Sequence, residues 1–163
     1  MGTYLLHKAT IVTGEKEAVG SIVVKDGKIA DVFYADSEDF DYNVFKAGTA
    51  YPDLERVELE GKHLMAGGID AHVHFREPGL THKADIYTES RAAAAGGVTT
   101  VMDMPNTKPA TISAETLQAK TELAEGRSCV NIGFHIGATN SNADEIIDIL
   151  EGRAPLSPDA VKG

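Results

Sequence analysis

Three apolar segments, each followed by a segment with the signals of a helix, succeed one another after His63. The apolar segments are 64–74, 98–104 and 129–136, and the helical segments are 85–95, 113–125 and 142–150. Ser113 is a favoured N-cap residue, and Asn142 followed by Glu145 has the spacing of a capping box. This alternation predicts an α/β fold made of repeated βα units.

Repeated βα units build a parallel sheet, whose strands read as continuous apolar runs because helices cover both faces. An open doubly wound sheet and a (β/α)₈ TIM barrel both fit three such units. Polar candidate residues lie at the carboxyl ends of the strands. Barrel enzymes place their active sites there, so these residues favour the barrel. A complete barrel needs about 250 residues. Residues 63–163 are therefore expected to hold its first three βα units, with 154–163 leading toward the rest.

Residues 1–62 follow a different pattern and are predicted to form a separate small β domain. Short alternating or β-branched runs at 5–6, 9–13, 21–25, 28–32 and 56–60 predict strands. Asp26-Gly27 between two of these runs is a strong two-residue hairpin signal. Residues 35–53 are polar and show no clear period, so we expect a long surface excursion there.

Composition narrows the class of protein. The chain has 15 Lys and Arg against 25 Asp and Glu, a formal charge of −10, which argues against binding to nucleic acid or to an anionic membrane. The single cysteine, Cys129, cannot form a disulfide within the chain and is expected to be buried. Neither a signal peptide nor an apolar run of about 18 residues is present, so a cytoplasmic location is predicted.

The pair His72 and His74 is the strongest chemical signal. Residues i and i+2 of a strand point to the same face, so two imidazoles on one strand can bind one metal ion. The competing interpretation is two ordinary polar side chains at the end of a strand. Asp70 just before them is expected to orient the histidine strand or to cap it.

Two further side chains are candidates for binding a substrate. Arg76 continues the parity of His72 and His74 if the strand persists, and its planar guanidinium suits a substrate carboxylate. Asn106 follows the next strand, and adjacent parallel strands lie about 5 Å apart, so both ends could converge on one ligand. Otherwise Asn106 would be a turn residue, and Arg76 would form a surface ion pair with Glu77 or Asp85.

Two blocks of sequence resemble a known family. Residues 67–79 (GGIDAHVHFREPG) resemble the first-strand signature of class I dihydroorotases, in the amidohydrolase superfamily. Residues 95–107 (AGGVTTVMDMPNT) resemble their second-strand block. The similarity runs through nearly the whole chain. It implies a metal-binding (β/α)₈ barrel with a small β-sandwich formed from both termini, to which residues 1–62 would contribute.

The resemblance also implies roles for individual residues. His72 and His74 would bind Zn²⁺, as one or two ions, while His74, Arg76 and Asn106 would contact dihydroorotate or N-carbamoyl-L-aspartate. The catalytic Asp and the later metal ligands of the family would lie beyond residue 163, so this stretch alone is expected to be inactive. Lys162, as a carboxylated bridging lysine, and Asp159 are weaker candidates for the fourth-strand ligand.

Alternatives from the same and from another class remain open. One is a different cyclic-amide hydrolase, an allantoinase or a dihydropyrimidinase (hydantoinase), although Arg76 and Asn106 argue against both. The other is a non-catalytic homologue that serves as a scaffold for a partner such as aspartate carbamoyltransferase, from which the metal histidines would be expected to be lost. A homodimer is possible. His135, near the end of the third strand, is a candidate for a supporting role at the site.

Overall fold

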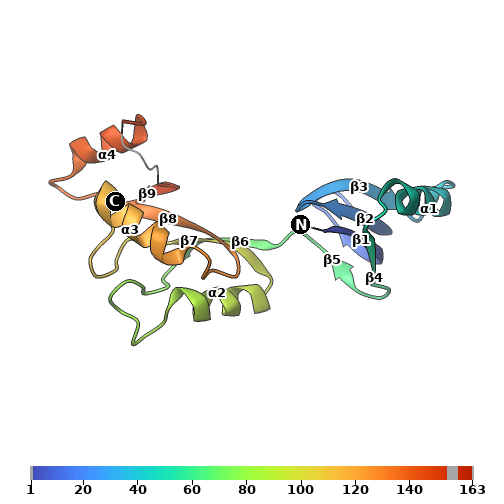
Figure 1. The fold of residues 1–163 in the computed structure, drawn as a ribbon, viewed down its shortest axis with the longest axis horizontal. Coiled ribbons are helices and arrows are strands. Elements are labelled where there is room, and N and C mark those ends of the chain that lie inside the picture. Colours follow the sequence, from blue (N-terminus) through green and yellow to red (C-terminus); the bar gives the residue numbers. More distant parts are fainter. Residues whose placement is uncertain (1, 154–157, 163) are drawn as a thin grey trace. The chain divides into compact units, whose positions relative to one another are not determined.

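The computed structural model describes residues 2–153 and 158–162 and divides the chain into two compact units, Met1–Ala66 and Gly67–Gly163 (Figure 1). The division falls shortly after the predicted domain boundary at residue 62. Each unit has its own apolar core.

The first unit is a β-sheet with one helix. Its elements are β1 (Thr3–Val12), β2 (Glu17–Lys25), β3 (Lys28–Tyr34), α1 (Phe40–Ala50), β4 (Leu54–Glu58) and β5 (His63–Leu64). The sheet has the order β3-β2-β1-β4, and β5 also pairs with β1. The predicted hairpin at Asp26-Gly27 is confirmed, since it joins the antiparallel strands β2 and β3 and both residues have positive φ. The two short strands expected at 5–6 and 9–13 are one strand, with a register shift between Leu6 and Ala9.

The surface excursion expected at residues 35–53 is wrong, because α1 occupies its centre. Phe40, Val44 and Ala47 recur at a helical spacing and are buried in the core of this unit. A stripe of only three apolar residues among Asp, Tyr, Asn and Lys was too sparse to read as a helix. The contact with the sheet supplies the stabilisation that the local sequence lacks.

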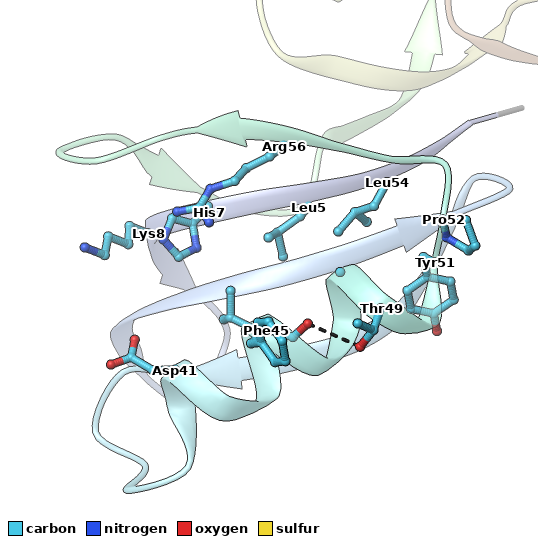
Figure 2. Close-up of a pocket in the computed structure, with 12 residues that line it drawn as sticks. Leu5, His7, Lys8, Asp41, Phe45, Thr49, Tyr51, Pro52, Leu54 and Arg56 are labelled. Carbon is cyan, nitrogen blue, oxygen red and sulfur yellow. Dashed lines mark hydrogen bonds between the residues drawn. The ribbon is translucent and has the colours of Figure 1, made fainter.

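A groove of about 670 Å³ lies between α1 and the strands β1 and β4 (Figure 2). The buried ring of His7 lines it, with Nδ1 3.0 Å from the hydroxyl of Ser21. Burial lowers the pKa of the His7 imidazole, and the positive charge of Arg56 acts in the same direction. His7 is therefore held neutral in the folded state at neutral pH.

The second unit is a four-stranded parallel sheet with a helix between each pair of consecutive strands (Figure 1). Its elements are β6 (Gly68–Val73), α2 (Ile86–Ala95), β7 (Val98–Asp103), α3 (Ala114–Ala124), β8 (Asn131–Gly137), α4 (Ala143–Leu150) and β9 (Ala160–Lys162). The predicted βα alternation is confirmed. Of the predicted lead-in at 154–163, residues 154–157 and 163 lie outside the described residues, and Ala160–Lys162 form a fourth strand.

In the second unit, polar side chains cap the starts of α2 and α3, whereas the cap predicted for α4 does not form. Asp85 and Ser113 accept hydrogen bonds from backbone N–H groups one turn into α2 and α3, so the N-cap expected at Ser113 is confirmed. The capping box at Asn142 and Glu145 is wrong. The Asn142 amide instead donates to two backbone carbonyl oxygens, and Glu145 accepts from the N–H of Ala114. These side chains join α4 to neighbouring segments rather than closing its first turn.

Among the described residues, no helix combines the length and the apolar character that crossing a membrane would require. The expected burial of Cys129 is wrong, because this residue is exposed, two residues before β8 begins.

Candidate metal and substrate site

His72 and His74 come together at the carboxyl end of β6. His72 lies within the strand, and His74 follows its last residue, Val73. The ring centroids are 5.3 Å apart, with the planes tilted by 60°. Two imidazoles at this separation can be brought onto one cation by small rotations of their side chains.

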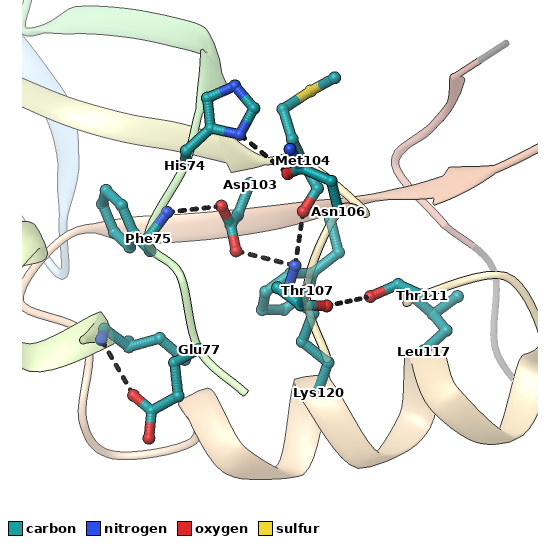
Figure 3. A network of polar contacts seen from close by, with 12 residues as sticks. His74, Phe75, Glu77, Asp103, Met104, Asn106, Thr107, Thr111, Leu117 and Lys120 are labelled. Atoms are coloured by element: carbon teal, nitrogen blue, oxygen red, sulfur yellow. Dashed lines mark hydrogen bonds and ion pairs between the residues drawn. The ribbon is translucent and has the colours of Figure 1, made fainter. Parts of the chain in front are cut away.

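Asn106 reaches the same point from the end of β7. Its Oδ1 lies 2.9 Å from Nδ1 of His74. A dashed line marks this contact in Figure 3. With the amide oxygen as acceptor, Nδ1 of His74 carries the proton, and Nε2 keeps a lone pair. A histidine held in this way by its other ring nitrogen is oriented as metal-binding histidines are in proteins.

Arg76 lies at this end of the sheet, but not by the parity that the sequence suggested. The strand ends at Val73, and Arg76 adopts a left-handed conformation with φ of 69°. The alternative ion pairs of Arg76 are also wrong, since Glu77 pairs with Arg127 and Asp85 caps α2. In residues 2–153 and 158–162 the Arg76 guanidinium has no hydrogen-bond or ion-pair partner.

A buried ion pair that the sequence did not reveal supports both strand ends (Figure 3). Oδ1 of Asp103 accepts from the N–H of Phe75 at 2.8 Å, and Oδ2 lies 2.8 Å from Nζ of Lys120. The same Nζ donates to the carbonyl oxygen of Met104 at 2.8 Å. The pair therefore fixes the backbone next to His74 and the backbone just before Asn106.

Lys120 is fully buried, and its burial lowers the pKa of the ammonium group, while Asp103 opposes that shift. One signal in the sequence could have revealed this residue. Lys120 occupies the same face of α3 as Leu117 and Ala124, where a lysine needs a buried partner.

The two loops that carry Arg76 and Asn106 are packed against each other. The N–H of Lys108 donates to the carbonyl oxygen of Pro78 at 3.1 Å. Gly79 has φ of +81°, and a Cβ there would lie 2.0 Å from the carbonyl oxygen of Lys108. Only glycine allows this close approach, which holds the loop after β6 on the loop after β7.

The sequence model of the Dihydro-orotase-like family matches residues 61–151, more than half of the chain. This chain belongs to the dihydro-orotase-like family. The matched region contains β6, β7 and β8 and all four of the candidate residues, namely His72, His74, Arg76 and Asn106.

Individual relatives of this dihydro-orotase-like chain include three kinds of cyclic-amide hydrolase. It is 48% identical over 83 residues to a dihydroorotase of Methanothermobacter thermautotrophicus, covering 51% of this chain and 19% of that protein. It is 32% identical over 148 residues to an allantoinase of Deinococcus radiodurans, covering 90% of this chain and 30% of the relative. Among solved structures, the L-hydantoinase (dihydropyrimidinase) of Arthrobacter aurescens superimposes with a TM-score of 0.78 at 26% identity, covering 100% of this chain and 33% of that one.

The chain thus spans between a fifth and a third of the length of these relatives. They support the predicted amidohydrolase family and an α/β fold with a parallel sheet of the hydantoinase type.

The described residues supply two candidate metal ligands, which is fewer than a complete metal site needs. In the part of the chain that the structure describes, no three His, Cys, Asp or Glu residues are gathered as a metal site requires. Asp159 accepts from the N–H of Phe134 at 2.8 Å, so its carboxylate supports β8. Lys162 lies in β9, the fourth strand. The ring nitrogens of His72 and His74 fit two positions of a zinc shell.

Proposed function

We propose that this chain forms the first part of the metal and substrate site of a dihydroorotase. The observation that carries the proposal is the 2.9 Å contact between His74 and Asn106, which joins the ends of two strands beside His72. The Arg76 guanidinium, which has no hydrogen-bond or ion-pair partner among the described residues, supplies a positive charge for an acidic ring at the same end of the sheet. The relative with the highest identity among those described above is a dihydroorotase.

The architecture proposed with this function is a (β/α)₈ barrel. Strands β6 to β9 would be its first four strands, with the site at their carboxyl ends. The domain containing residues 1–62 would belong to a small β-sandwich, and that containing 63–163 to the barrel. The consecutive parallel order of the four strands and the likeness to the L-hydantoinase support this assignment.

The reaction proposed is the reversible hydrolysis of (S)-dihydroorotate to N-carbamoyl-L-aspartate, a step of pyrimidine synthesis. Water adds across the cyclic amide, so its hydroxyl group joins the carbonyl carbon, the C–N bond breaks, and a proton passes to the nitrogen. Zn²⁺, as one or two ions, would lower the pKa of a bound water and polarise the amide carbonyl. His72 and His74 would hold it through ring nitrogens that have no partner among the described residues.

The other residues would position the substrate. Arg76 would bind the ring carboxylate through two parallel hydrogen bonds. Because Oδ1 of Asn106 already accepts from His74, its Nδ2 amide group would donate to the same carboxylate. Fixing the carboxylate aims the amide carbon at the attacking oxygen and lowers the entropic part of the barrier. The general acid and base, an Asp in this proposal, would lie beyond residue 163.

The positively charged guanidinium of Arg76 favours dihydroorotate over allantoin or dihydrouracil, because of these three only dihydroorotate carries a carboxylate. A non-catalytic scaffold is disfavoured by the retention of both histidines in adjacent positions. Binding to aspartate carbamoyltransferase, a homodimer and a cytoplasmic location stay predictions.

The test uses the protein expressed with its complete natural sequence. We expect bound zinc and turnover of dihydroorotate, with neither allantoin nor dihydrouracil hydrolysed at a comparable rate. His72→Ala should lose both zinc and activity, whereas His63→Ala, an exposed histidine of the first unit, should lose neither. Unchanged zinc content and activity in His72→Ala, or turnover of allantoin alone, would overturn the proposal.

A further inference from the structure

The strand that carries His72 contains an irregularity at that residue. In the pairing of β6 with β7, Asp70 lies opposite Val101 and Val73 lies opposite Asp103. Three residue steps on β6 thus face two steps on β7. The extra residue falls at Ala71–His72 and forms a bulge, which re-aims side chains and takes backbone groups out of the ladder.

Two side chains bind the backbone groups of this bulge. Oδ1 of Asp70 accepts from the N–H of His72 at 3.0 Å, a contact that fits both roles expected of Asp70, orienting the histidine strand or capping it. The carbonyl oxygen of Ala71 lies 3.0 Å from Nε2 of His135. His135 belongs to β8, which is not a neighbour of β6, so its ring reaches past β7 to this carbonyl.

The contact identifies the donating nitrogen of the His135 ring. A carbonyl oxygen only accepts, so Nε2 carries the proton and donates it. Nδ1 is buried and has no hydrogen-bond partner among the described residues. The His135 ring thus donates to the carbonyl oxygen of Ala71 in β6. This 3.0 Å contact is the one polar contact of its side chain within the described part of the chain.

We propose that His135 is a positioning residue, which fixes the bulge of β6 and thereby the direction of the His72 ring. The peptide between Ala71 and His72 is held from both ends, by His135 at its oxygen and by Asp70 at its nitrogen. Rotation of that peptide would turn the Cα–Cβ bond of His72 away from His74. The inference rests on the proposed role of His72 as a metal ligand.

Substitutions at His135 separate this role from simple packing. His135→Gln keeps an N–H donor at nearly the same reach as Nε2. His135→Asn is also an amide but is one methylene too short, and His135→Leu removes the donor. Outer partners of metal ligands typically change metal affinity by about 10- to 100-fold when removed. We therefore expect zinc to bind about 10- to 100-fold more weakly to the Leu and Asn variants, and within about threefold of wild type to the Gln variant.

Two measurements on the protein with its complete natural sequence decide the matter. Zinc affinity is measured by competition with a chelating dye, and amide hydrogen exchange across residues 68–75 is followed in the metal-free protein. The Leu and Asn variants should exchange faster across this segment, and the Gln variant should not. If the Leu variant does not fold, the comparison of Gln with Asn still decides.

The possible failures are distinguishable. Equal zinc affinity and exchange in the Gln and Asn variants, while His72→Ala loses zinc, would refute the role of His135 and leave the proposed function standing. Retention of zinc by His72→Ala would instead refute the proposed function.

Discussion

Replacing Lys120 with methionine probes the buried ion pair beneath the site. The substitution keeps the length and the apolar stem of the side chain but removes the ammonium group. Within the described part of the chain, the Asp103 side chain would then retain only the N–H of Phe75 as a partner, and the carbonyl oxygen of Met104 would lose the Lys120 donor. Both charged side chains are essentially inaccessible to water, with exposed fractions of 0% and 1%.

The magnitude follows from this burial. Removing one partner of a buried pair leaves an uncompensated charge and typically costs about 3–5 kcal/mol. A domain is stable by only about 5–15 kcal/mol, so Lys120→Met should remove a large part of the stability of the second unit. We also expect weaker zinc binding, because Asp103 and Lys120 hold the backbone beside His74 and Asn106.

Urea unfolding followed by far-UV circular dichroism measures the change. Lys83→Met is the matched control, because Lys83 is exposed and its loss should change the free energy of unfolding by no more than about 0.5 kcal/mol. In the double variant Asp103→Asn/Lys120→Met the buried charge is gone while an acceptor for Phe75 remains. Part of the lost stability should therefore return.

A decrease in the free energy of unfolding below about 1 kcal/mol in Lys120→Met would refute this reasoning, since the substitution would then not have left a buried charge without its partner. A double variant less stable than Lys120→Met would show that the Asp103 charge is not what destabilises the single variant.

Three further perturbations follow. Arg76→Met should raise the KM for dihydroorotate about tenfold or more while zinc content stays unchanged, because the guanidinium has no partner among the residues that the structure describes; an unchanged KM would contradict its role. Because the pKa of His7 is lowered on folding, the stability that its neutral form contributes is present above the unfolded pKa of 6.5 and is lost as the pH falls through that value toward the folded pKa. Urea unfolding at pH 7.5 and 5.5 should thus show a smaller pH dependence in His7→Gln than in wild type, with no such change in His63→Gln. Arg127→Met removes two hydrogen bonds to Glu77. Because Arg127 is partly exposed, we expect the free energy of unfolding to fall by only about 1–2 kcal/mol, measured by thermal unfolding; a change near zero would contradict this.

The sequence by itself determined the elements of the second unit and the cluster of candidate residues. Apolar runs, caps and glycines are local signals, and they located the strands and helices from β6 to α4. The i, i+2 spacing predicted that the rings of His72 and His74 lie close together, and they do, although His74 follows the last residue of β6. Parallel strands bring their ends together, so the approach of Asn106 to His74 followed from topology.

Only the tertiary structure decided how these residues are held. Lys120 is polar in the sequence, yet it is buried because Asp103 lies opposite it in the folded state. The helix α1 forms because a sheet covers its sparse apolar stripe, and the carbonyl oxygen of Ala71 in the bulge contacts a histidine that is 64 residues away. Partners distant in the chain decide whether a polar group can be buried, and no local pattern encodes where they will lie.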